Sequence, residues 1–125
     1  MPARHRVQEP DDAPLLARLR ALCLALPGVT ETRSWGHPNF RTQKCVFVTY
    51  EWVARQPSMA FRVGPDGIAR YLAQPRFFAT PYGRGEWISL KAGGRPNWRL
   101  ITTLVQKSHR LAAPAPRARA RPRRP

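Results

Sequence analysis

A single helical stripe of apolar residues occupies the first part of the chain. The residues that recur with the spacing of one helix face are Leu15, Leu16, Leu19, Leu22, Cys23 and Leu26. Asp11-Asp12 supplies acid at the start of this stripe, and Pro14 suits a first helical turn. Pro27-Gly28 ends the pattern. We therefore expect an amphipathic helix that begins after Asp12 and stops at Pro27.

The apolar period changes from about 3.6 to two between Val29 and Val63, which predicts strands. We expect strands at 29–35, 44–52 and 58–64, with Thr42-Gln43 turning a hairpin. Strict alternation in 44–52 predicts that Cys45, Phe47 and Thr49 share one face, opposite Val46, Val48 and Tyr50. In 58–64 it directs Met59, Phe61 and Val63 inward and Arg62 outward.

The second half of the pattern predicts two helices and one more strand. Asp66 is placed to cap a short helix that runs through Leu72, and 86–92 alternates like a strand. The stretch 74–87 resembles a loop, although it carries four aromatic residues. Asn97 is placed to cap a last helix at 98–111, whose apolar residues are Trp98, Ile101, Leu104, Val105 and Leu111. The order α-β-β-β-α-β-α predicts an α+β fold, a small antiparallel sheet with helices packed on one side.

Length and composition indicate one domain, because 125 residues suffice for one modest core. We expect a flexible N-terminus at 1–11, a domain at 12–113 and a disordered Arg/Pro-rich tail at 114–125. No apolar leader or membrane-length stretch is present in the sequence, so we expect a cytoplasmic protein without membrane contact. Cys23 and Cys45 lack metal-type spacing and are expected to be free thiols.

Charge is the unusual feature of the composition. Lys plus Arg number 22 against 7 Asp plus Glu, a formal charge of +15. Residues 13–111 alone hold 15 basic and 4 acidic residues, hence +11 without the termini. The preference for Arg over Lys has a compositional explanation, but the shortage of acids does not. Such an excess favours a polyanionic partner, and nucleic acid above others.

The segment "WGHPNFR" contains the one candidate for catalysis, His37. Its neighbour Ser34 lacks a Gly-x-Ser-x-Gly elbow, and the few acids of the chain are dispersed. The three histidines lie in unrelated segments, without carboxylates at ligand spacing. We therefore expect no catalytic residue, no metal, no cofactor and no enzymatic activity. We expect Gly36 to allow a tight bend and Pro38 to fix the entry of the chain into the following hairpin.

Four motifs give the chain a family resemblance. They are "LPGVTET", "WGHPNFR", "PRFFATPYGRGEWISL" and "NWRLITTLVQKSHRLAAP", and together they resemble the MmcQ/YjbR family over about residues 15–114. The resemblance implies a small α+β domain with a double-wing motif and a predicted DNA-binding role. The fold-signature positions that it implies are Trp35, Gly36, Pro38, Phe40, Tyr82, Trp87, Trp98 and Ser108. His109 departs from the pattern, in which Tyr is common.

The function expected from charge and resemblance together is binding of duplex DNA by a monomer through a basic double-wing face. The outward cations predicted to touch phosphates are Arg41, Lys44, Arg62, Arg84, Lys91, Arg95, Arg99 and Arg110. If about six made contact, log K would fall with log salt at a slope of roughly −5. Residues 1–113 should then bind in low salt without the tail. The alternative is a small-ligand or protein-partner module that uses the aromatic 77–87 loop.

Overall fold

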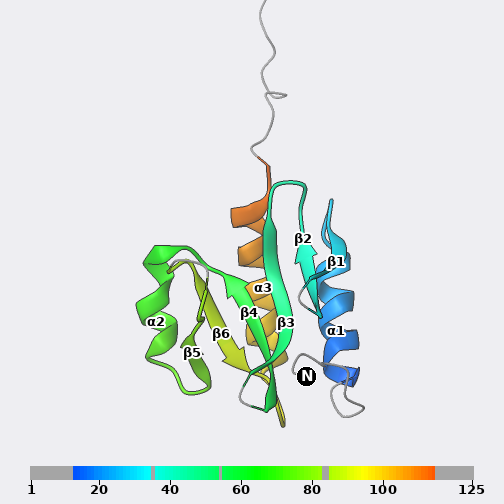
Figure 1. Cartoon of the computed structure of the whole chain (residues 1–125). Helices are drawn as coiled ribbons and strands as arrows, with labels where there is room; N and C mark the ends of the chain where they lie inside the picture. Colours follow the sequence, from blue (N-terminus) through cyan, green and yellow to red (C-terminus); the bar gives the residue numbers. More distant parts are fainter. Residues whose placement is uncertain (1–12, 35, 54, 83–84, 115–125) are drawn as a thin grey trace, which may run out of the picture.

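The computed structural model in Figure 1 describes residues 13–34, 36–53, 55–82 and 85–114. Its helices are α1 (Ala13–Leu24), α2 (Ile68–Leu72), which follows the short 3-10 turn η3 (Pro65–Gly67), and α3 (Trp98–Ala112). Its strands are β1 (Thr30–Ser34), β2 (His37–Arg41), β3 (Val46–Val53), β4 (Gln56–Arg62), β5 (Phe77–Ala79) and β6 (Trp87–Lys91). No helix among these residues is long and apolar enough to span a bilayer.

The six strands form one antiparallel sheet in the order β1-β2-β3-β4-β6-β5. In Figure 1, α3 lies behind β3 and β4, α1 lies beside β1 and β2, and α2 lies beside β5. Residues of all three helices join one core cluster with the same side of the sheet. The predicted class, α+β with helices on one side of a small antiparallel sheet, is confirmed.

The predicted order of elements lacked two strands. His37–Arg41 is a strand of its own, paired with both β1 and β3. Phe77–Ala79 lies in the stretch expected to be a loop, and it pairs with β6 at the sheet edge. A three-residue strand gives almost no period-two signal, so its pairing with β6 rather than its own sequence defines it.

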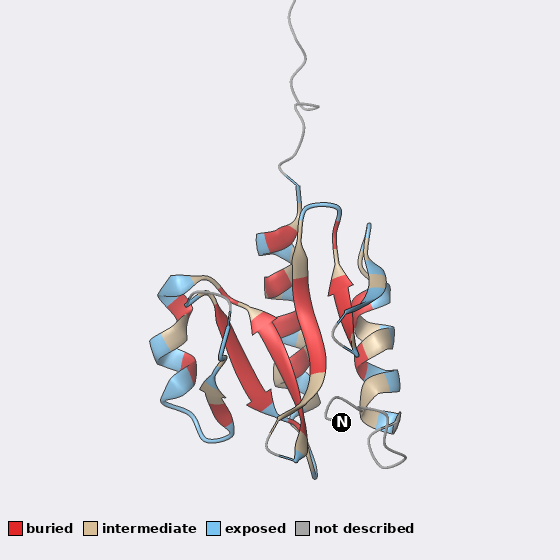
Figure 2. Cartoon of the chain, viewed as in Figure 1, coloured by how far each residue is buried: buried red, intermediate tan, exposed pale blue. Residues whose placement is uncertain are grey.

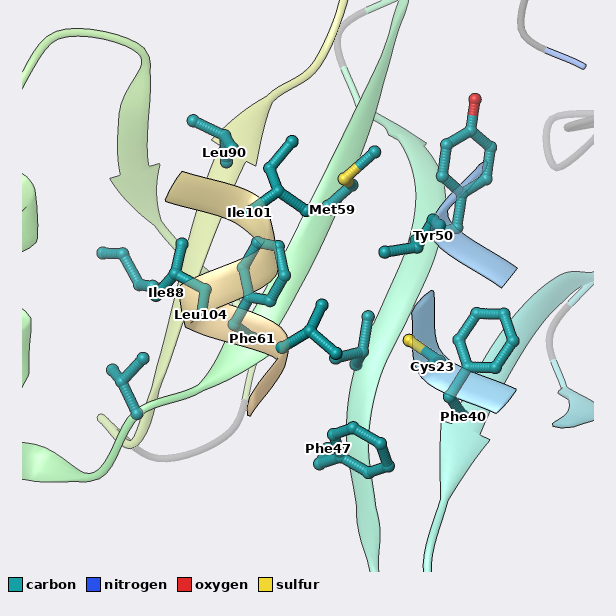
Figure 3. Packing of buried hydrophobic residues seen from close by; sticks show 14 of the residues in the cluster. Cys23, Phe40, Phe47, Tyr50, Met59, Phe61, Ile88, Leu90, Ile101 and Leu104 are labelled. Carbon is teal, nitrogen blue, oxygen red and sulfur yellow. The ribbon is translucent and has the colours of Figure 1, made fainter. Parts of the chain in front are cut away.

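The core lies between the sheet and the helices, and Figure 2 shows that the central strands are buried along most of their length. Cross-strand pairing places Phe40, Val48, Phe61 and Ile88 in one row across four strands, each with no exposed surface. They pack in one cluster with Ile101 and Leu104 of α3 and with Cys23 of α1, as the close view in Figure 3 shows. This row marks the face of the sheet that packs against the helices. We call the opposite face the open face because no described helix covers it, although its central residues, such as Thr49 and Ser89, are also at most 5% exposed.

A β-bulge interrupts the alternation predicted for β3. Arg41 pairs with Val46 while Phe40 pairs with Val48, which leaves Phe47 as the extra residue. The Phe47 ring is fully buried and meets His109 of α3 edge-on at 5.4 Å between ring centroids. The prediction that Phe47 and Thr49 share a face was therefore wrong, because Thr49 lies on the open face. The inward direction of Met59 and Phe61 is confirmed.

The helix ends agree with the sequence in part. The Asn97 side chain accepts hydrogen bonds from the amides of Arg99 and Leu100, so the predicted cap is confirmed. Asp66 instead lies inside η3, and Gly67 occupies the cap position of α2 without a side-chain bond. Leu111 is 45% exposed, whereas Ala112 is fully buried. The predicted start of α1 at Asp11-Asp12 lies outside the described residues.

Most of the fold-signature residues are structural. Pro38, Phe40, Trp87 and Ser108 are buried, Trp98 is half-buried against the core, and Gly36 has a φ of 82° that favours glycine. Tyr82 is the exception, with an exposed edge. Trp35 lies outside the described residues. Both cysteines are free thiols; Cys23 is buried, and this burial raises the pKa of its thiol, whereas Cys45 is half-buried.

Candidate nucleic-acid interface

The seven described cations that the sequence predicted as DNA contacts do not lie on one face. They fall into two groups at opposite ends of the sheet, visible in Figure 1 as the β2–β3 turn and, at the other end, the start of α3. We call the first group, with two further cations, the hairpin end: Arg41, Lys44, Arg62, Arg70, Lys107 and Arg110. We call the second group, to which two further cations also belong, the far end: Arg55, Arg76, Lys91, Arg95 and Arg99. Arg84 lies outside the described residues.

One buried threonine joins the hairpin turn to the end of α3. The Thr42 hydroxyl donates a hydrogen bond of 2.7 Å to the carbonyl of Ala112. The same oxygen accepts from the amides of Lys44 at 3.0 Å and Cys45 at 3.2 Å. Thr42 is only 3% exposed, so these bonds are shielded from water. The turn that carries Lys44 is thereby fixed against the last turn of α3, which carries Arg110.

Backbone carbonyls hold two guanidinium groups of the hairpin end in place. Arg41 donates to the carbonyls of Thr42 at 3.1 Å and Gln43 at 3.4 Å. Arg62 donates to the carbonyl of Val46 at 3.0 Å. Because carbonyl partners leave the positive charge uncompensated, Arg41 remains available to an anion. Arg62 also lies 5.1 Å over the Trp87 ring and 3.3 Å from the Glu86 carboxylate, so its charge is partly balanced.

A shallow depression widens the hairpin end on the helix side. Its volume is about 300 Å³, and its charged lining residues are Asp66, Arg70, Lys107 and Arg110. Sequence analysis missed Arg70 and Lys107. Lys107 and Arg110 are three residues apart and therefore share a face of α3, a signal that the sequence contained. Arg70 could not be placed, because the position of the short helix α2 depends on the tertiary fold.

The far end gathers cations from the β3–β4 turn, the start of β5 and the segment that leads into α3. Arg76 donates to the carbonyl of Lys91 at 3.3 Å and also to that of Gly93. Arg55 and Arg76 have φ values of 66° and 78°, and they are the two non-glycine residues with positive φ in the described chain. A left-handed conformation costs a non-glycine residue roughly 1–2 kcal/mol.

The middle of the molecule separates the two ends, and we call this region, the centre of the open face and of the exposed side of α3, the neutral waist. On the open face, pairing aligns Asn39, Thr49, Ala60 and Ser89 in one row across four strands, and each of these uncharged side chains is at most 5% exposed. On the exposed surface of α3, Thr103 and Gln106 occupy the middle of the helix. The eight residues of β3 that connect the ends span about 23 Å.

An acid–base pair that sequence analysis did not find lies on the open face. The Glu51 carboxylate accepts a 2.6 Å hydrogen bond from the Tyr82 hydroxyl and lies 3.4 Å from His37 Nε2. Tyr82 is also 3.2 Å from the Thr49 hydroxyl. The expectation that no acid meets His37 is therefore corrected. The side chains of His37 and Glu51 are only 14% and 15% exposed.

The chemistry of this cluster favours a structural role. His37 Nδ1 is enclosed and without a hydrogen-bond partner among the described residues, so neither ring nitrogen is open to an incoming substrate. Burial and the Glu51 carboxylate both raise the pKa of the Tyr82 hydroxyl, which keeps it a donor. Tyr82 is thereby held on the open face, where its ring also meets Trp87 edge-on. The described residues contain no group of three potential metal ligands.

The aromatic residues of 77–87 are engaged in packing. Phe77 and Trp87 are buried, and Phe77 contacts Tyr71 of α2 with 5.3 Å between ring centroids. None of them lines the basic depression or a second one, of about 370 Å³, between α1 and α3. The second depression has mostly apolar walls.

A family comparison decides the classification of this chain. The model of the YjbR family matches residues 24–111, more than half of the sequence. The chain belongs to the YjbR family. None of the proteins with curated functions matches it significantly. The match begins within α1 and ends within α3, so it includes the whole sheet and both cation groups.

Solved structures of related folds agree with this classification. A Deinococcus radiodurans protein with a DUF419 domain matches with a TM-score of 0.68 and 17% identity, over 80% of this chain and 79% of that one. A Pseudomonas syringae protein matches with a TM-score of 0.60 and 15% identity, over 67% of this chain and 86% of that one. At such identities the likeness shows the fold, and the YjbR chain described here shares it.

Proposed function

We propose that this YjbR protein binds duplex DNA by its phosphate backbone, that the hairpin end is the main contact surface, and that the role is binding rather than catalysis. The observation that carries the proposal is the gathering of cations at one end, where the Thr42 bond to Ala112 fixes the turn with Lys44 against α3 and a depression brings Arg70 beside Arg110. These cations are exposed or half-buried, which suits contacts to phosphates. Phosphate contacts position a protein on DNA without reading its bases.

The charge balance at the hairpin end supports the proposal. The acids near its cations are Asp66 and Glu86, and Glu86 is already paired with Arg62. The sequence that follows Pro114 adds five arginines and no acid, and it starts from the end of α3. A duplex on the hairpin end is therefore close to the point from which these arginines extend. If six phosphates are contacted, the salt slope of log K is roughly −5.

Matched charge-neutral variants test the assignment of the surface. The hairpin-end variant is Lys44→Gln with Arg70→Gln and Arg110→Gln, and the far-end variant is Lys91→Gln with Arg95→Gln and Arg99→Gln. Each removes three charges from exposed side chains that have no hydrogen bond or ion pair in the described structure. The measurement is fluorescence anisotropy of one labelled duplex across a salt series, with protein in excess.

We expect the hairpin-end variant to lose about three units of salt slope, because each lost phosphate contact removes about one. Its affinity at low salt should fall about 10- to 100-fold, since each exposed ion pair contributes about 0.5–1 kcal/mol. The far-end variant should change much less. The same series is repeated in the tail-neutral variant, in which Gln replaces Arg117, Arg119, Arg121, Arg123 and Arg124. Loss of all duplex binding in the tail-neutral chain would contradict the proposal and assign the activity to the tail.

A further inference from the structure

We propose that the far end is a second duplex-binding surface, and that one molecule therefore holds two duplex segments at once. This inference rests on the proposed function, because it assigns a role to the cations that the hairpin end leaves unused. The partner at the far end is of the same chemical class, the phosphate backbone of a second duplex. Bridging two segments is a different activity from binding one.

The separation of the two ends is the first argument. β3 spans about 23 Å from the hairpin turn to the β3–β4 turn. The 15 residues of α3 span about 22 Å, and Arg99 near its start lies about 17 Å along the helix axis from Arg110 near its end. Both the sheet and the longest helix thus place one cation group at each of their ends. Such spacing gives each group its own direction of approach.

The waist argues against one duplex that lies along the molecule and touches both ends. On the open face, such a duplex would pass over Tyr82, which is fixed there by its bonds to Glu51 and Thr49. The Glu51 carboxylate would repel phosphates at that point. Along α3, the middle of the exposed surface offers Thr103 and Gln106, which are neutral. Beside them lies a cation, Arg18 of α1, which lines the depression with Gln106 and lies 4.6 Å over the Trp98 ring near the start of α3. The positive track along α3 is therefore sparse, and the track past Tyr82 is interrupted by an acid.

The backbone of the far end is the second argument. Arg55 and Arg76 keep long cationic side chains at positive-φ positions, where glycine costs less free energy. The guanidinium of Arg76 bonds the carbonyls of Lys91 and Gly93, which fixes the segment before α3. Lys91, Arg95 and Arg99 project from this segment and are exposed. The arrangement keeps cations of three segments together at the end opposite the hairpin.

A capture assay with the full-length chain tests the inference. One duplex is immobilised on beads, the protein is added, and a fluorescent duplex of unrelated sequence follows after washing. The wild-type chain should retain the second duplex. The far-end variant should still bind the immobilised duplex within about threefold of wild type but lose most of the capture. The tail-neutral variant should keep the capture, since both ends are intact.

Each other result has a definite meaning. Capture by the far-end variant at the wild-type level would overturn the inference while leaving the proposed function in place. Equal losses of single-duplex affinity in the two matched variants would indicate one duplex that spans both ends, which also overturns it. An equimolar mixture of the two variants should not capture; restored capture would show that bridging needs an assembly. A wild-type chain that binds no duplex at all would refute the proposed function itself.

Discussion

The two cationic ends of the molecule are built in different ways. The hairpin end combines side chains from β2, β4, α2 and α3, which are far apart in the sequence. Thr42 bonds the turn to the end of α3, the carbonyl of Val46 holds Arg62, and a shared depression brings Arg70 to α3. Most of the far end comes from one short segment, Lys91 to Arg99, to which Arg76 is bonded. The hairpin end therefore depends on tertiary packing, whereas the far end depends mainly on local turns. A change in packing should affect the first and spare the second.

The largest effect should come from removal of the Thr42 hydroxyl. Thr42→Val leaves the Ala112 carbonyl and two turn amides without their partner, so unfolding free energy should fall by about 2 kcal/mol. Single-duplex affinity should fall as the hairpin turn loosens. Urea denaturation and anisotropy measure both effects. Thr103→Val is the matched control, since its exposed hydroxyl bonds the Arg99 carbonyl within α3, and an equal loss there would contradict the account.

The neutral waist should affect stability without affecting DNA binding. Tyr82→Phe removes a 2.6 Å bond to a carboxylate, which should lower the unfolding free energy by about 1.5 kcal/mol. The pKa of Tyr82 is raised by burial, so its contribution is present below pH ~10 and is lost as pH rises through the folded pKa. Denaturation between pH 8 and 12 should show that loss in wild type and not in the variant. Weaker duplex binding at neutral pH would place Tyr82 in the interface instead.

The two cysteines give a chemical probe of the hairpin end. Burial raises the pKa of Cys23, so it should react only on unfolding, whereas the half-buried Cys45 should react in the native chain. Iodoacetate adds a negative charge beside Lys44, and iodoacetamide adds a neutral group of similar size. Modification by iodoacetate should weaken duplex binding about three- to tenfold more than modification by iodoacetamide. Mass spectrometry measures the extent of modification, and anisotropy measures duplex binding. Identical effects of both reagents would show that charge at this turn does not matter.

The smallest effect should come from the ion pair between α1 and β1, outside both ends. Arg20 lies 2.6 Å from Glu31 and holds the pKa of that carboxyl below its usual range. Its contribution is therefore present above pH ~4.3 and lost as pH falls through the lowered pKa. Because Arg20 is well exposed, Glu31→Gln should cost less than about 1 kcal/mol at pH 7 and nothing at pH 2. Thermal melts of wild type and variant at pH 7 and pH 2 measure this difference in stability. A larger loss of stability at pH 2 than at pH 7 would contradict the ion pair.

The sequence predicted the class of fold because its strongest signals are periodic. The stripe of α1, the cap at Asn97 and the inward faces of 58–64 depend on local spacing, which a sequence displays directly. The motifs that resemble the YjbR family implied the same class of fold, a small α+β domain. Neither showed β5, whose three residues become a strand only by pairing with β6.

The candidate site was predicted less well, and the bulge at Phe47 shows why. Without it, Asn39 would pair with Val48 and His37 would lie opposite Tyr50; with it, Asn39 pairs with Thr49 and His37 meets Glu51. One inserted residue thus decides which side chains meet on the open face, and no local pattern marks it. The grouping of cations into two ends likewise depends on where the turns meet α3, which charge counts do not contain.

The most direct test of the central claim is a map of the duplex-binding surface by amide NMR shifts of the full-length, tail-neutral chain. With a short duplex added below one equivalent, we predict the largest shifts in residues 41–45, 62–64 and 107–113. Shifts in 91–99 should follow only as a second equivalent is added. Shifts centred on the open-face row or on α1, with the hairpin end unchanged, would contradict the account.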